Sequence, residues 1–117
     1  MKYIKVLEPI VLKNLFDKDI VQTDEEGKKF ASSMSFKNFL LQRVGDQKLS
    51  ADMESLEIVV RLKKAIDSAD THVELETSDW KALVEVVKNP SSPYNPVFAY
   101  CLLPFMKAVE QASDEKE

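Results

Sequence analysis

Residues 95–109, NPVFAYCLLPFMKAV, form a strongly apolar stretch in which Lys107 is the only charged residue. The stretch is well short of the ~20 residues that a membrane-spanning helix needs, so it must pack within a domain or against a partner. It contains two prolines: Pro96 suits the first position of a helix, whereas Pro104 removes a donor from a helix interior. The sequence therefore predicts a helix over 97–111 that bends at Pro104.

This predicted helix is apolar on every side. One face carries Phe98, Cys101, Leu102, Phe105 and Val109. The other large side chains fall on different faces, and they are Val97, Tyr100, Leu103 and Met106. A helix that is apolar all round must be covered all round, which is demanding for a small chain with a high surface-to-volume ratio. Two interpretations stay open: these four residues are ordinary core, or they form an interface with a second copy or another protein.

Three more segments, 35–44, 51–69 and 78–89, have apolar residues at helical spacing. Each follows residues that cap helices well, namely Ser35, Ser50, and Thr77 or Ser78. The segment 51–69 is the longest and carries two overlapping apolar stripes, so we expect it to lie centrally. The predicted core is drawn from these helices: Leu62, Ile66, Trp80, Leu83, Val87, Phe98 and Leu102.

The first thirty residues follow a different pattern. They alternate imperfectly and are interrupted by Pro9, which predicts a short strand at 2–7 and an extended piece at 10–13. Residues 22–29 are rich in acids and turn formers, which is typical of a loop. A further short alternation at 71–76, THVELE, predicts a brief strand or an extended connector.

These patterns predict a mainly α, four-helix domain over 31–112, with α+β as the open alternative. An extended or hairpin-like arm is expected over 1–30, and an acidic, frayed tail over 113–117. The composition fits one globular domain, with 44% hydrophobic residues, 31% charged residues and a net charge of −4. The basic residues are scattered among acids, which argues against nucleic-acid binding.

The location is expected to be cytoplasmic, with no membrane association. The only cysteine, Cys101, has no intrachain partner for a disulfide. The N-terminus lacks the uninterrupted apolar run of a signal peptide.

No group of residues indicates catalysis, a metal or a cofactor. The only histidine, His72, has carboxylates nearby in sequence, but structural zinc needs four Cys or His ligands at set spacings. Cys101 lies in an apolar run, where a thiol is usually an inert small hydrophobe. The chain has two glycines, too few for a phosphate-binding loop or a dinucleotide fingerprint. We therefore expect a protein that is not an enzyme and binds no cofactor or metal.

The order of helices and spacings in 35–109 is carried by SFKNFLLQRV, LSADMESLEIVVRLKKAI, VELETSDWKALVEVVK and NPVFAYCLLPFMKAVEQA. It resembles that of small helical proteins encoded by tailed bacteriophages and prophages. The resemblance implies a phage protein of the host cytoplasm that works by contacts, often as an oligomer, and it transfers no functional residue.

The function expected from the sequence is a non-enzymatic protein-interaction module. It would be a phage assembly or host-modulating factor that acts through apolar helix surfaces. A small-molecule or nucleotide-binding regulator is the alternative, and a nucleic-acid-binding regulator is the third.

Overall fold

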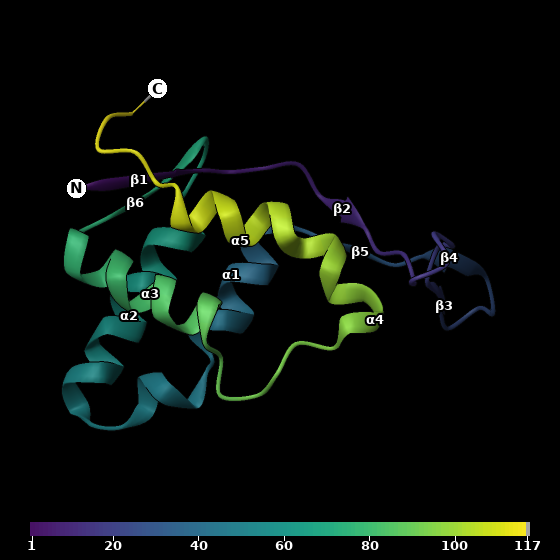
Figure 1. The fold of residues 1–117 in the computed structure, drawn as a ribbon, viewed down its shortest axis with the longest axis horizontal. Coiled ribbons are helices and arrows are strands. Elements are labelled where there is room, and N and C mark those ends of the chain that lie inside the picture. The colour runs from purple at the N-terminus through teal and green to yellow at the C-terminus, as the bar shows by residue number, and fades with distance from the viewer. Residues whose placement is uncertain (117) are drawn as a thin grey trace.

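A computed structural model describes residues 1–116 and shows helices together with three antiparallel pairs of short strands (Figure 1). In chain order the elements are β1 (Lys2–Lys5), β2 (Ile10–Val11), β3 (Val21–Thr23), β4 (Lys29–Ala31), β5 (Ser33–Met34), α1 (Phe36–Val44), η1 (Gln47–Ser50), α2 (Met53–Asp67), β6 (His72–Leu75), α3 (Thr77–Lys88), α4 (Pro96–Ala99), η2 (Tyr100–Leu102) and α5 (Leu103–Glu110), where η marks a 3₁₀ helix. The prediction of a mainly α, four-helix domain is wrong. With 47% helix and 18% strand, the fold is α+β.

The four predicted helical segments are confirmed, but two of their caps differ from the prediction. Ser35 caps α1 as expected, through its hydroxyl oxygen. The cap of α2 is Asp52 instead of Ser50, because a carboxylate accepts a backbone N–H and also complements the positive end of the helix. The helix α3 begins after Glu76 without a side-chain cap.

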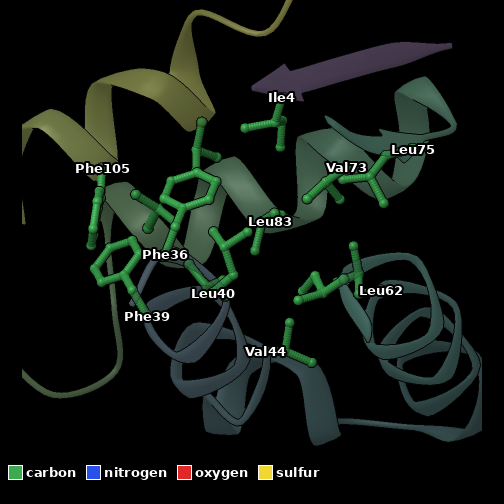
Figure 2. Close-up of a cluster of buried hydrophobic side chains, with 14 of the residues drawn as sticks. Ile4, Phe36, Phe39, Leu40, Val44, Leu62, Val73, Leu75, Leu83 and Phe105 are labelled. Carbon is green, nitrogen blue, oxygen red and sulfur yellow. The ribbon is translucent and has the colours of Figure 1, made fainter. Parts of the chain in front are cut away.

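Strand β1 belongs to the core of the molecule. It pairs antiparallel with β6, with Ile4 opposite Val73 in the register. Both side chains are buried, and Figure 2 shows them together with Leu75 at the edge of the helical core. The segments predicted as extended at 2–7 and 71–76 are therefore partners, which explains the error in fold class: extended segments far apart in sequence satisfy each other's backbone groups.

The C-terminal residues that the structure describes are attached to β1. Tyr3 and Ser113 exchange two backbone hydrogen bonds, at 2.8 and 3.0 Å. The Lys2 ammonium lies 2.8 Å from the Asp114 carboxylate. The free edge of β1 and the charge of Lys2 thus give Ser113 and Asp114 partners within the segment predicted to fray over 113–117; Glu117 lies outside the described residues.

The core is centred on aromatic contacts between α1 and α5. The Phe105 ring lies 5.0 Å from the Phe36 ring in a T-shaped contact and 5.6 Å from the Phe39 ring. Among the residues predicted to be inside, Trp80 and Phe98 are half-buried and the others are buried. The Trp80 indole N–H donates to the Val109 carbonyl oxygen at 2.8 Å, so its polar edge is satisfied.

Helix α2 lies at one side of the molecule, not at its centre (Figure 1). One of its two apolar stripes, which includes Leu62 and Ile66, packs into the core. The outer stripe stays exposed at Met53, Leu56 and Val60, which we call the α2 stripe. The wide apolar face was correctly predicted, but its central position was not, because no element covers the second stripe.

Residues 10–34 form a projecting arm that ends in the β3–β4 hairpin (Figure 1). At its base, three backbone amides donate in a closed ring: Leu12 to Ser32 at 2.8 Å, Ser32 to Ile20 at 2.7 Å, and Ile20 to Leu12 at 3.0 Å. The arm expected over 1–30 is thus shifted along the chain, because β1 lies in the core and β5 completes the arm.

Candidate interaction surface and adjoining cavity

The apolar segment 95–109 folds as α4, η2 and α5 in succession. Asn95 caps α4 with its side-chain oxygen, and Pro96 occupies an early helical position. The helix tightens to 3₁₀ geometry over Tyr100–Leu102, and α5 starts afresh at Leu103, directly before Pro104. Pro104, where a bend was predicted, thus lies in the first turn of a new helix, which accommodates a residue without an N–H.

The four residues predicted as a candidate interface separate into two groups. Val97, Tyr100 and Leu103 are exposed by 46%, 42% and 48%, which is unusual for large apolar side chains that follow one another along a helical segment. Met106 is half-buried and packs against the core. The structure thus brings three of the predicted residues to the surface, one each on α4, η2 and α5.

The arm contributes two further exposed apolar side chains, on a turn whose backbone Tyr100 contacts. The Tyr100 hydroxyl donates to the Asn14 carbonyl oxygen at 2.6 Å, and the Cys101 sulfur lies 3.4 Å from both backbone polar atoms of Lys13. The turn held in this way carries Leu15 and Phe16, which are 61% and 82% exposed. We call Leu15, Phe16, Val97, Tyr100 and Leu103 together the arm face.

Leu15 and Phe16 were not predicted as interface residues. A signal was available, because an adjacent apolar pair stands between the turn formers Asn14 and Asp17. Asp17 adopts a left-handed backbone, with φ of 61°. Such a turn leaves the side chains at its tip without neighbours on one side.

The Tyr100 hydroxyl is kept in its neutral, donating form. Desolvation raises its pKa, and the neighbouring Cys101 and Asp17 side chains raise it further. Cys101 is half-buried against the arm. Its contacts to Lys13 are structural: they fix the arm to η2.

His72 lies on β6, where its Nδ1 is 3.0 Å from the Thr71 hydroxyl. It is half-buried near Glu74 and Lys116, which form an ion pair at 3.2 Å. Within residues 1–116 no three His, Cys, Asp or Glu side chains are grouped so that they could hold a metal ion.

A cavity of about 380 Å³ lies between the end of α1, the loop after α3, and α4 with η2. Its apolar wall includes Phe39, Phe98 and Leu102, and its polar wall includes Arg43, Asp46 and the loop residues Ser91 and Ser92. Its volume falls in the range of small-ligand sites, which are mostly apolar with a few polar groups.

Two fixed opposite charges line this cavity. The Arg43 guanidinium carbon lies 4.9 Å from the centre of the Tyr94 ring and 6.0 Å from that of Phe39. Asp46 accepts hydrogen bonds from the Ser91 N–H at 2.8 Å, the Ser91 hydroxyl at 2.5 Å and the Lys48 N–H at 2.8 Å. Desolvation opposes ionisation of Asp46, but these hydrogen bonds outweigh it and hold its pKa below the ordinary value.

At neutral pH, the variant Asp46→Ala is expected to lower the free energy of unfolding by about 1 kcal/mol, the usual contribution of a helix cap. Because the folded-state pKa of Asp46 lies below 3.8, its contribution is present above that pH and is lost as the pH falls through the folded pKa. Urea denaturation at neutral and acid pH should therefore give a difference that shrinks in acid. The control Ser50→Ala removes a hydrogen bond to Gln47 but no titrating group. Its loss of free energy of unfolding should therefore not shrink in acid. A deficit at Asp46 that acid does not reduce would contradict the assignment.

Comparison with known proteins gave no match: no family model matches the chain, and no curated protein or solved structure matches it significantly. Among residues 1–116, no helix combines the length and apolar character needed to cross a membrane.

Proposed function

We propose that the chain is a non-enzymatic protein-interaction module that associates with a second copy of itself through the arm face. The observation that carries the proposal is the hydrogen bond from Tyr100 to Asn14. It joins two segments that are 86 residues apart, each bearing large exposed apolar side chains. Soluble monomers rarely keep such side chains together on one surface, so contiguous groups of this kind usually mark contact sites.

The expected strength of this association can be estimated from the apolar surface area that the dimer would bury. The five side chains of the arm face are between 42% and 82% exposed, so burying the exposed part of each contributes about 1 kcal/mol. A symmetric dimer buries every one of them twice, for about 10 kcal/mol in all. Association costs about 4–15 kcal/mol, so the two amounts are comparable. We therefore expect a reversible dimer whose population rises with protein concentration.

The double variant Tyr100→Glu, Leu103→Glu should abolish this dimer, because each contact would then bury unpaired carboxylates. Sedimentation equilibrium should show a monomer at every concentration, while the wild-type protein moves toward the dimer as its concentration rises. Circular dichroism should show unchanged helix content, since both side chains are exposed in the monomer.

A matched control is available on α2. The double variant Met53→Glu, Val60→Glu adds the same charge to two exposed apolar positions outside the arm face, where the side chains are 75% and 65% exposed. It should leave the dimer intact. A wild-type protein that stays monomeric when concentrated, or a dimer that only the α2 variant dissociates, would overturn the proposal.

The resemblance of the helix order to phage-encoded proteins supports a role in phage assembly or in modulating the host. A second candidate, a small-molecule-binding regulator, is favoured by the cavity between α1 and α4 and its paired charges.

A further inference from the structure

The cavity beside α1 is built from parts of the chain that other contacts hold in place. Asp46 ties the loop after α3 to the end of α1 through Ser91. The Tyr94 hydroxyl donates to the Val87 carbonyl oxygen at 2.8 Å, which fixes the same loop to α3. The wall opposite the loop is formed by the inner side of α4 and η2, whose outer side carries the arm face. The cavity is thus largely formed before any ligand arrives.

Arg43 supplies the cavity with a positive charge that the rest of the described chain does not neutralise by a direct ion pair. Two aromatic rings hold its guanidinium, which is half-buried. The six ion pairs among residues 1–116 all involve other basic side chains. Its Nε is buried and makes no hydrogen bond, so only the terminal nitrogens remain to bind a group in the cavity. A guanidinium held in this way is suited to bind a carboxylate with two parallel hydrogen bonds.

Asp46 supplies the opposite charge on the same wall, three residues further along the chain. Its carboxylate already accepts three hydrogen bonds, yet two carboxylate oxygens together offer about four acceptor sites. One site thus remains for a donor in the cavity. A doubly charged anion such as phosphate would be repelled by Asp46, and a simple cation would be repelled by Arg43.

We propose that this cavity binds a small zwitterion, an α-amino acid with an apolar side chain. Arg43 binds its carboxylate, Asp46 binds its ammonium, and the apolar side chain packs against Phe98 and Leu102. This inference develops the second candidate function and does not depend on self-association through the arm face.

The test uses L-leucine and L-phenylalanine as probes of the full chain, with two matched analogues of leucine. One analogue is 4-methylpentanoate, which lacks the ammonium, and the other is 3-methylbutylamine, which lacks the carboxylate; inorganic phosphate is a third comparison. Isothermal titration should show saturable binding of at least one amino acid, with each analogue and phosphate weaker by about tenfold or more, since each leaves one fixed charge unpaired. Absence of saturable binding by both amino acids up to their solubility limits would overturn the proposal.

Two variants test whether Arg43 and Asp46 bind the charged groups of the amino acid. Arg43→Gln should weaken amino-acid binding by about tenfold or more, and the control Lys64→Gln, which removes an exposed charge on α2, should not. Asp46→Asn should lower the affinity for the amino acid, and it should raise the affinity for 4-methylpentanoate relative to that for the amino acid. If Arg43→Gln fails to fold, nuclear magnetic resonance of the wild-type protein decides: leucine should shift the amide signals of 42–47 and 91–95. Binding that Arg43→Gln leaves unchanged, or shifts confined to other segments, would refute the site. The dimer test concerns the opposite side of α4, so either proposal can fail alone.

Discussion

Replacing Phe105 with alanine is expected to lower the free energy of unfolding by about 3–5 kcal/mol. Phe105 is fully buried, and its ring is in contact with both Phe36 and Phe39. Truncation would leave a cavity between α1 and α5 that the two remaining rings cannot fill without leaving their own positions. Chemical denaturation followed by far-ultraviolet circular dichroism measures the change.

The control lies two residues earlier in the same helix. Leu103→Ala removes an apolar side chain that is 48% exposed, and in dilute, monomeric protein it should change the free energy of unfolding by no more than about 0.5 kcal/mol. Similar losses at Leu103 and Phe105 would mean that α5 is rotated relative to the core.

The helices could be predicted from the sequence because their determinants are local. The apolar residues of α1 and α3 recur at helical spacing, and Ser35 and Pro104 act on the backbone beside them. The cap of α2 was misplaced by two residues, because both Ser50 and Asp52 are good caps and only the 3₁₀ turn before the helix separates them.

The strand pairing could not be predicted, because it joins residues that are 67 to 73 positions apart in the chain. Both extended segments were recognised, but alternation in Lys2–Lys5 does not reveal that its partner is His72–Leu75. The acidic end of the chain has the composition of a frayed tail, yet the free edge of β1 and the charge of Lys2 bind it. In each case a contact distant in sequence overrode the local signal.

The residues of the candidate surface, too, could be predicted only in part from their spacing in the sequence. In a 3₁₀ turn the side chains at i and i+3 lie in line, which keeps Tyr100 and Leu103 on one side. From Leu103 onward the helix is α, so three residues advance the side chain by about 300° and turn Met106 toward the core. Periodicity alone placed Met106 with the others, because the change of helix type was not visible in it. The cavity with Arg43 and Asp46 could not be predicted either, because the loop after α3 that completes it is distant in sequence.

The predicted and the observed fold differ most clearly in how much free energy of unfolding is lost when the Ile4 side chain in β1 is truncated. Ile4→Ala should lower the free energy of unfolding by about 2–5 kcal/mol, because Ile4 is 1% exposed and packs beside Val73 in the core. If residues 1–30 were a peripheral arm, as the sequence predicts, the same change would cost little.

Val21→Ala is the matched change in the arm, on the exposed strand β3, where the side chain is 54% exposed. It should alter the free energy of unfolding by no more than about 0.5 kcal/mol. Urea denaturation of both variants at the same protein concentration makes the comparison. A large loss at Ile4 with almost none at Val21 requires β1 to be part of the core and β3 to lie outside it. If both variants lost little free energy of unfolding, Ile4 would not be buried in the core. The β1–β6 pair would then be wrong, and β1 would belong to the peripheral arm that the sequence predicts.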